Sequence, residues 1–419
     1  MSNYSDRRGN ITRFPGRREA AVQKRRTKEN RTAHDSRAES RVVITEYDHI
    51  IFIATMILVA FGLVMVLSAS YYASINSGGT WYHFFRMQAV GAALGLVGMV
   101  IMAGKRTKIP FTNKHFNAMR MLVSVSTPFY IISNTLLLYV ALFGEEINGA
   151  RRWIAWGPVN FQPSELAKVA VILMMAAYIS KDINRANNFR GLLGCLAILS
   201  LPIGLVFWAG GLSTVIILGA IGFVMVFLAS PHFWRFIVLA ASGAGAGALA
   251  LWIDYIRGGF RGARFISGWL DPFSSPTGIG FQTVQSLYAV ASGGLFGLGL
   301  GNSNQKLYYL PEAQNDFIFA IIVEELGLFG AMFVLLLFGI LVWRGSRAAI
   351  YSRNILGCLV AAGIVTMISV QVIINVGVVT NTIPNTGIPL PFISYGGTSI
   401  AVMMTAMGML LNISRHQKA

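Results

Sequence analysis

Residues 48–70 read DHIIFIATMILVAFGLVMVLSAS, and this stretch decides the class of fold. It carries no charged residue from Ile50 to Ser70, and about 20 apolar residues in a helix cross the roughly 30 Å hydrocarbon core of a membrane. Nine similar runs follow, near 84–103, 120–143, 164–180, 191–208, 212–229, 233–254, 316–343, 355–380 and 394–414. The sequence therefore predicts an all-α integral membrane protein with ten transmembrane helices. Only Gly210-Gly211 separates the fifth run from the sixth, and merging them would leave nine spans.

The composition supports membrane embedding. Hydrophobic residues make up 54% of the 419 residues, charged residues make up 12%, and the mean hydropathy is +0.59. So few charges cannot cover the surface of a soluble protein of this size. The composition excludes a cytosolic enzyme, a fibrous protein and a secreted disulfide scaffold, and the two cysteines, Cys195 and Cys358, form no metal-ligand pattern.

The positive charge follows the topology of a membrane protein. Residues 1–46 hold 12 basic and 6 acidic residues and few large apolar ones, which predicts a disordered cytoplasmic tail without a cleavable signal peptide. The net charge of +17 is otherwise spread over short loops between apolar runs. We interpret it as a topology signal with contact to anionic membrane lipids, and we expect no nucleic-acid partner.

Counting basic residues by side gives the orientation. Ten spans with an internal N-terminus place 26 of the 34 Lys and Arg residues inside, so we predict that both termini are cytoplasmic. The ten-helix membrane domain then covers residues 47–415. Its large extracytoplasmic loop, 255–315, lies between helices 7 and 8, and apolar residues such as Trp269 and Phe273 favour its packing on the membrane domain.

The basic residues that break this rule indicate a site. Six lie in the outer loops and two lie near the outer ends of spans: Arg86, Arg151, Arg152, Lys168, Arg257, Arg261, Arg264 and Lys306. Arg and Lys are the usual phosphate binders, which favours an outward-facing cavity for a phosphate-bearing anion. The alternative for each Arg alone is a side chain that extends to the membrane interface.

Acidic residues accompany this basic set. Glu165 and Lys168 are three residues apart at the start of the fourth span and can pair on one helix face. Asp316 lies where the long loop enters the eighth span and is a candidate general base; the alternative is a helix N-cap, and Glu312 is a rival base. Glu324 and Glu325 lie deeper and favour internal hydrogen bonding. Gly243, Gly245 and Gly247 inside the seventh span predict close helix packing.

Three blocks of sequence resemble one family. The blocks read NGARRWI and FQPSELAK (148–154, 161–168); LDP, GFQTVQS, GLGN, LPEAQNDFIFA and EELG (270–272, 280–286, 299–302, 310–320, 324–327); and GIPLPFISYGGTS (387–399). The chain resembles the shape, elongation, division and sporulation (SEDS) family of FtsW/RodA-type peptidoglycan polymerases over residues 47–415, and its second block is similar to the division branch, FtsW. A sporulation-specific member of the family would have a similar second block. One departure is Gln314-Asn315, where the family often has His-Thr before the aspartate.

The resemblance implies a peptidoglycan glycosyltransferase. It would polymerise lipid II into glycan strands on the outer face of the bacterial cytoplasmic membrane, at the division septum. It implies that Asp316 is the essential acid, which takes the proton of the acceptor 4-hydroxyl and inverts the anomeric centre. The substrate-binding residues expected with it are Arg86, Arg151, Arg152, Glu165, Lys168, Arg261, Arg264, Gln282, Gln285, Ser286, Lys306, Glu312, Ser394 and Thr398.

The resemblance also implies partners. They are lipid II and the lipid-linked glycan, a class B penicillin-binding protein with transpeptidase activity, other cell-division proteins and membrane lipids. No cofactor is required by the sequence, and a divalent cation, Mg²⁺ or Mn²⁺, is an alternative to basic residues for stabilising the pyrophosphate. Two other functions stay open: a lipid II flippase and a non-catalytic scaffold of the division complex.

Overall fold

The structure is a computed structural model. It describes residues 47–76, 80–104, 118–147, 150–156, 159–230, 234–256, 268–274, 276, 278, 280–307 and 309–415. The tail predicted over residues 1–46 therefore lies outside the described residues.

The described chain is mainly helical, and every predicted span coincides with a long helix. The helices that match the ten spans are α2 (His49–Asn76), α3 (His83–Ala103), α4 (Ala118–Phe143), α5 (Pro163–Lys181), α7 (Phe189–Trp208), α8 (Leu212–Ala229), α9 (Trp234–Ile256), α12 (Ile318–Ile350), α13 (Ile355–Val379) and α14 (Gly397–Ser414). Within the described residues, nine of these are long and apolar enough to cross a membrane, and α9 is the one outside that set. Because α7 ends before Gly210 and α8 begins after Gly211, the fifth and sixth runs form separate helices.

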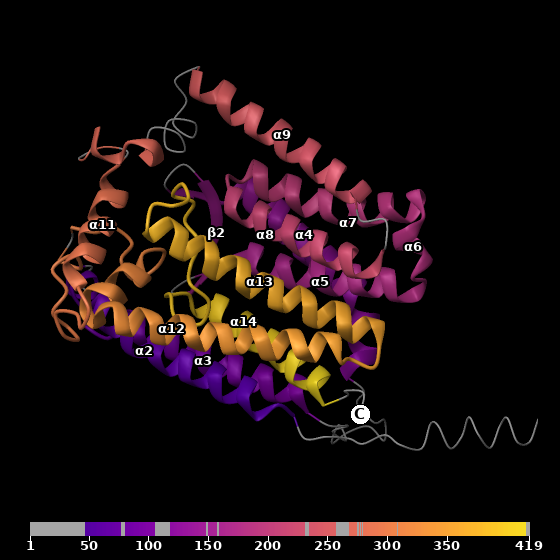
Figure 1. The fold of residues 1–419 in the computed structure, drawn as a ribbon, viewed down its shortest axis with the longest axis horizontal. Coiled ribbons are helices and arrows are strands. Elements are labelled where there is room, and N and C mark those ends of the chain that lie inside the picture. Colours follow the sequence, from indigo (N-terminus) through magenta and orange to yellow (C-terminus); the bar gives the residue numbers. More distant parts are fainter. Residues whose placement is uncertain are drawn as a thin grey trace, which may run out of the picture. The chain divides into compact units, whose positions relative to one another are not determined.

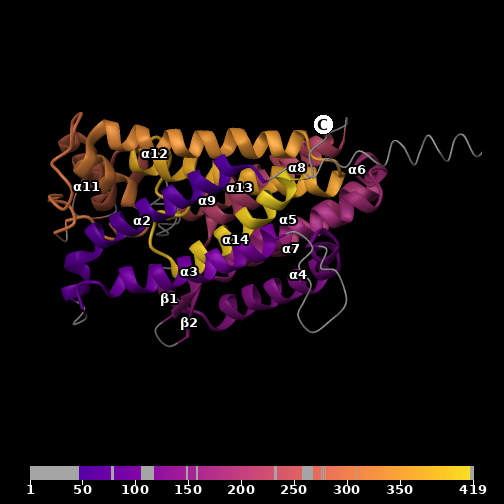
Figure 2. The same cartoon turned by 90° about the horizontal axis from the view of Figure 1, so that it is seen from below.

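The helices pack around α13. It contacts α5, α8, α12 and α14, and most of its residues are buried. α12 also contacts α2 and α14, while α3 packs along α14 (Figures 1 and 2). α9 lies along the edge of the bundle next to α8 (Figure 1). The buried apolar side chains of these helices form one continuous core.

Glycines set the closest helix contact. A Cβ at Gly91 on α3 would lie 2.2 Å from the carbonyl oxygen of Gly397 on α14, and a Cβ at Gly95, one turn on, would meet Met404 at 2.9 Å. Small residues four apart let membrane helices approach backbone to backbone. The glycines of α9 do not act in this way: a Cβ at Gly243, Gly245 or Gly247 would meet no described atom within 4 Å. Among the described residues, the close packing predicted for those three glycines is not found.

A small antiparallel sheet precedes α5. Its strands are β1 (Glu145–Ile147), β2 (Ala150–Trp156) and β3 (Val159–Phe161), in the order β1-β2-β3. β2 pairs with β1 through Arg151 opposite Glu146, and with β3 through Ile154 opposite Phe161. The apolar runs predict only helices, so the sheet is a local correction to the all-α fold class. It carries Arg151 and Arg152 directly before the helix that carries Lys168.

The described part of region 255–315 contains the 3-10 turn η1 (Pro272–Ser274) and the helix α11 (Phe281–Gly293), which packs on α12. α12 is interrupted at Gly327, whose φ of 67° is left-handed. There the amides of Leu298 and Gly299 donate to the carbonyls of Glu324 and Glu325, at 2.9 Å each. The segment after α11 thus satisfies backbone groups that the break in α12 leaves open, as non-helical backbone at membrane depth requires.

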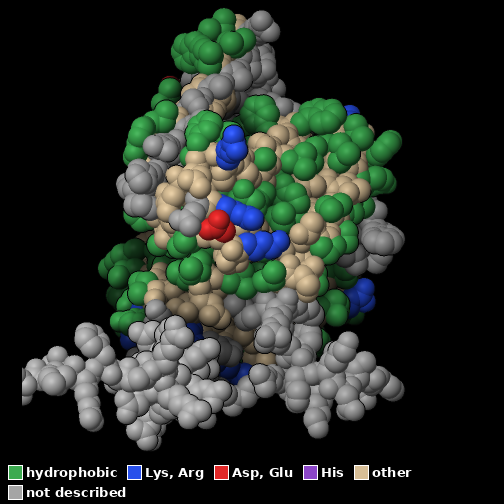
Figure 3. Space-filling view, turned by 90° about the vertical axis from the view of Figure 1, so that its right-hand side faces the viewer, with side chains coloured by type: hydrophobic (Ala, Val, Ile, Leu, Met, Phe, Trp, Pro, Cys, Tyr) green, Lys and Arg blue, Asp and Glu red, His purple; other side chains and the backbone are tan. Residues whose placement is uncertain are grey.

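The bundle has two distinct ends. α11 marks one end and the short helix α6 (Asn184–Asn187) marks the other (Figures 1 and 2). Figure 3 views the α6 end, where Lys and Arg side chains surround an acidic one among hydrophobic side chains. The charged residues of the end of α5, α6 and the start of α7 are Lys181, Asp182, Arg185 and Arg190. Asp316 lies toward the opposite end, because it precedes α12 on the side of α11.

Candidate active site

The segment that carries Asp316 runs in turns to Phe317 and leads into α12. Phe317 occupies the N-cap position, so the reading of Asp316 as the N-cap is wrong. Asp316 is partly buried, and its backbone carbonyl accepts a hydrogen bond of 2.8 Å from Asn375 Nδ2 on α13. The same amide group donates to the carbonyl of Ile388 at 2.7 Å. Asn375 therefore ties the Asp316 segment to the loop that follows α13.

A second tie comes from Ser394. Its buried hydroxyl donates to the carbonyl of Asn315 at 2.6 Å and accepts from the amide of Leu390 at 2.7 Å. The next residue, Tyr395, donates its amide to the carbonyl of Gln314 at 2.9 Å. The backbone on both sides of Asp316 is thus held in place, and Ser394 acts there as a support.

Gly387 lies next to an acidic and a basic side chain. It has a left-handed φ of 65°, and a Cβ there would lie 2.9 Å from Asp316 Oδ2 and 3.7 Å from Arg152 Nη1. The carboxylate and the guanidinium therefore reach the same glycine from different elements. A side chain at position 387 would fill the space that they border.

The sheet positions Arg152 through the turn between α7 and α8. Arg152 Nη2 donates to the carbonyl of Gly210, and the amide of Arg151 donates to the carbonyl of Ala209 at 3.1 Å. Ser213 at the start of α8 donates its hydroxyl to the carbonyl of Thr386, beside Gly387. Arg151 is exposed while Arg152 is partly buried. Of the two neighbouring arginines, Arg152 is the one brought to Asp316.

The predicted pairing of Glu165 with Lys168 is confirmed. Lys168 Nζ lies 2.7 Å from Glu165 Oε1, and the two residues are 1% and 3% exposed. Both lie in the first two turns of α5, which begins with Pro163 at the position where proline fits a helix. Two charges buried this deeply stabilise each other only as a pair.

The packing of α5 on α13 gives the depth of this pair. The loop after α13 meets Arg152 of β2, in the sheet that precedes α5, at Gly387, so the two helices run antiparallel. A Cβ at Gly363 on α13 would lie 2.8 Å from Ile172 Cγ2 on α5. At 1.5 Å per residue, Glu165 is then level with residue 370, roughly 8 Å deeper than Asn375. We infer from this backbone spacing that the site has two layers, with Asp316 and Arg152 above Glu165 and Lys168.

Lys306 belongs to a different cluster. Its ammonium lies 2.8 Å from Glu325 Oε1 and donates to the hydroxyl of Ser68 on α2. Glu324 accepts hydrogen bonds from the Ser303 hydroxyl and the Asn304 amide. The internal hydrogen-bonding role predicted for both glutamates is confirmed. The cluster lies about 10 Å along α12 from its start, so the structure does not bring Lys306 to Asp316.

The other predicted residues take several positions. Glu312 has a left-handed φ of 56° and accepts a hydrogen bond from Asn315. On α11, Gln282 accepts from Asn385 at 3.0 Å, Gln285 is partly buried, and Ser286 donates to the carbonyl of Val379 at 2.9 Å. Arg86 is exposed on the first turn of α3 and Thr398 is partly buried on the first turn of α14. Arg261 and Arg264 lie outside the described residues.

Sequence reasoning missed three neutral residues of the site. Asn375 and Gln88 are buried, and Gln88 joins α3 to the carbonyl of Ser394 and the amide of Gly396. Gly387 shapes the space between Asp316 and Arg152. The available signal was a lone amide residue within an apolar run, which is costly in a membrane unless it is bonded.

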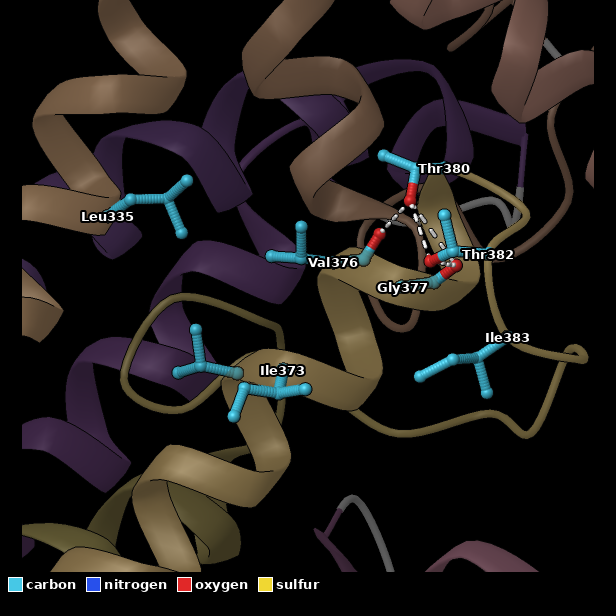
Figure 4. A pocket seen from close by; sticks show the side chains of 8 residues that line it. Leu335, Ile373, Val376, Gly377, Thr380, Thr382 and Ile383 are labelled. Atoms are coloured by element: carbon cyan, nitrogen blue, oxygen red, sulfur yellow. Dashed lines mark hydrogen bonds between the residues drawn. The ribbon is translucent and has the colours of Figure 1, made fainter.

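A separate apolar groove lies between α12 and the end of α13. It has a volume of about 300 Å³ and is lined by Leu335, Ile373, Val376, Ile383 and their neighbours (Figure 4). The hydroxyls of Thr380 and Thr382 in its wall bond to backbone carbonyls of α13. With no charged lining residue, this groove does not suit a phosphate-bearing ligand.

The described residues contain no cluster of three His, Cys, Asp or Glu side chains that could hold a metal ion. A protein-made cage for a divalent cation therefore does not fit this part of the chain. The basic side chains that the structure places in this region include Arg152, beside Asp316, and Lys168, which is paired with Glu165. The geometry suits proton abstraction by Asp316 next to a group whose negative charge Arg152 stabilises.

Comparison with known proteins identifies a family. A family model described as cell cycle protein, covering FtsW, RodA and SpoVE, matches residues 48–419. Stage V sporulation protein E of Bacillus subtilis is 38% identical over 376 residues, which cover 89% of this chain and 98% of that protein. The probable peptidoglycan glycosyltransferase FtsW of Trichlorobacter lovleyi is 34% identical over 378 residues, covering 90% and 95%.

Solved structures share the fold. A chain from a peptidoglycan synthase complex, described for its structural coordination of polymerization and crosslinking, has a TM-score of 0.67 at 26% identity and covers 88% of this chain and 98% of its own. Rod shape determining protein RodA of Thermus thermophilus has a TM-score of 0.61 at 25% identity, covering 89% and 98%.

Proposed function

The chain belongs to the FtsW/RodA/SpoVE family of cell cycle proteins, and on this premise we propose that it is a multi-pass membrane peptidoglycan glycosyltransferase of cell division. The observation that carries the proposal is the meeting of Asp316 and Arg152 at Gly387. Its substrate is lipid II, and its product is a glycan strand that stays linked to undecaprenyl pyrophosphate.

Asp316 acts as the general base. It takes the proton of the 4-hydroxyl of an incoming lipid II while that oxygen attacks the anomeric carbon of the growing glycan. The bond from the anomeric carbon to the pyrophosphate oxygen breaks as the new glycosidic bond forms, and the anomeric centre is inverted. A single base is enough for this displacement. The ties from Asn375 and Ser394 keep the Asp316 backbone fixed, so little reorganisation is needed during the reaction.

Basic side chains stabilise the departing pyrophosphate. Arg152 borders the same space as Asp316, and the ammonium of Lys168 lies in the layer beneath. Glu165 orients Lys168 and balances its charge when no substrate is bound. Arg86, Arg151, Arg261 and Arg264 guide the anionic lipid to this space. A cation carried mainly by the pyrophosphate, Mg²⁺ or Mn²⁺, is the alternative, and polymerisation in the presence of EDTA distinguishes the two.

The Asp316 end faces the outside of the cytoplasmic membrane. The basic residues at the α6 end support this orientation, because positive charge favours the cytoplasmic side. With α9 as the seventh span the protein crosses ten times, both termini are cytoplasmic, and the region 255–315 is extracytoplasmic. The protein works at the septum with a class B penicillin-binding protein that crosslinks the new strand, together with other division proteins. The structural match to a synthase complex supports that partner.

The test is polymerisation of purified lipid II in proteoliposomes, with and without the class B partner. We expect glycan polymer when lipid II is supplied from outside. A flippase would instead move labelled lipid II between leaflets and make no polymer, and a scaffold would do neither. Absence of polymer with the partner present and the protein folded would contradict the proposal.

A further inference from the structure

One buried amide side chain on α13 makes no contact with other described residues that explains its presence. Gln371 lies on α13, one helical turn before Asn375, and is 1% exposed. Neither its Nε2 nor its Oε1 has a hydrogen-bond partner among the described residues. An amide without partners is costly in a membrane-spanning helix, where no bulk water can bond to it.

Gln88 shows what a structural glutamine looks like in this protein. It is also buried, but its Nε2 donates to the carbonyl of Ser394 at 3.0 Å and its Oε1 accepts from the amide of Gly396 at 2.8 Å. Gln88 therefore joins two segments of the chain. Gln371 joins nothing within the described residues, so stability alone does not explain an amide at this position.

Two further buried acceptors without partners among the described residues lie within about one helical turn of Gln371 along the helix axes. Glu165 is level with residue 370 by the packing of Gly363 on Ile172, and its Oε2 is buried without a partner among the described residues. Asn375 Oδ1, one turn above Gln371, is in the same state. Gln371 and Asn375 are four residues apart and so lie on one face of α13. Measured along the helices, Gln371 is therefore level with the lower layer of the site.

We propose that Gln371 is a further binding residue of this site, and that with Glu165 and Asn375 it binds hydroxyl groups. The three carbonyl and carboxylate oxygens accept hydrogen bonds and would repel a phosphate. A hydroxyl group donates to such an oxygen and also accepts from Gln371 Nε2. The hydroxyls come either from a sugar of the substrate or from water held beneath it. The inference deepens the proposed function and rests on it.

The test compares Gln371→Met with Gln88→Met, each of which replaces an amide by an apolar side chain of similar shape. Polymerisation kinetics, lipid II binding and thermal unfolding are measured for both, beside wild-type protein and Asp316→Asn. We expect Gln371→Met to keep the wild-type Tm or exceed it, because no bond within the described residues is lost, and to lose about tenfold or more in kcat/KM. We expect Gln88→Met to have a lower Tm than the wild-type protein, since it leaves the carbonyl of Ser394 and the amide of Gly396 unpaired.

The kinetic constants identify the source of the hydroxyl. A raised KM with weaker lipid II binding assigns it to the sugar, and a lowered kcat at unchanged KM assigns it to water. Unchanged activity and binding in Gln371→Met would overturn the inference. So would a fall in Tm as large as that of Gln88→Met, because it would reveal a structural role. A wild-type protein that makes no polymer would instead contradict the proposed function, and lipid II binding by Gln371→Met would still test this inference.

Discussion

At the scale of the residue, Gly387 controls the geometry of the proposed base. A Cβ there would come within 2.9 Å of Asp316 Oδ2, so Gly387→Ala pushes the carboxylate away from its position. A displacement of about 1 Å costs on the order of 10²-fold in rate. We expect this loss in kcat for lipid II polymerisation.

The matched control for that change is Gly301→Ala. Gly301 has a comparable left-handed φ of 84°, but a Cβ there would meet no described atom within 4 Å. In both variants an alanine takes a left-handed backbone conformation, which costs about 1–2 kcal/mol. Equal losses of activity in the two variants would show that strain, and not contact with Asp316, is responsible.

The two buried ion pairs differ in function. Lys168→Met leaves Glu165 charged and buried, and we expect the free energy of unfolding to fall by ~3–5 kcal/mol. The double variant Lys168→Met/Glu165→Gln recovers stability but not polymerisation, because the ammonium is missing from the site. The double variant Lys306→Met/Glu325→Gln recovers both. Measurements of Tm and polymer yield test this prediction. Recovery of activity in the Lys168 double variant would show that Lys168 is not part of the site.

The charged residues of the site can be predicted from the sequence, and the neutral ones cannot. Lys168 and Arg152 were found because a basic residue near the outer face breaks the charge pattern, and the resemblance supported Asp316. The charge pattern cannot distinguish Lys306 from the basic residues of the site. Its partner Glu325 is distant in sequence and comes close only in the fold. Asn375 and Gln371 carry no charge, so only their burial and hydrogen bonds identify them.

At the scale of the element, the contact of α3 with α14 is set by glycines. Gly91→Ala places a Cβ 2.2 Å from a backbone oxygen of α14, which cannot move as a side chain can. We expect the helices to separate and the free energy of unfolding to fall by roughly 1–3 kcal/mol, as for an overpacked core. Thermal unfolding in detergent measures it.

Gly243→Ala in α9 is the control for that change. It adds the same methyl group where no described atom lies within 4 Å, so stability stays constant or rises by up to about 1 kcal/mol from helix propensity. A large loss of stability in Gly243→Ala would indicate that α9 is closely packed at this glycine, as the sequence predicted.

The helices were predictable because length and apolar content are enough to define a span. The strands β1–β3 and the helix α11 were missed because short polar segments carry no comparable signal. The break of α12 at Gly327 was missed for a related reason: its backbone groups are satisfied by residues 294–299, a contact that a pattern within α12 does not contain.

At the scale of the whole molecule, the topology can be tested by labelling. In a variant without Cys195 and Cys358, a cysteine replaces the exposed Asn302 near the Asp316 end or the exposed Arg353 between α12 and α13. We expect a membrane-impermeant maleimide to label Asn302→Cys in intact cells and Arg353→Cys only after permeabilisation. The reverse pattern would place the site in the cytoplasm and contradict the proposed orientation.

The most direct test of the central claim is glycan polymerisation from purified lipid II by Asp316→Asn, with the class B partner present. Glu312→Gln, the rival base, and Asp271→Asn, an exposed acid outside the site, run as controls. We predict that Asp316→Asn makes no polymer while it retains the wild-type Tm, and that Asp271→Asn stays active. Polymer from folded Asp316→Asn, or its loss in Glu312→Gln alone, would contradict Asp316 as the catalytic base.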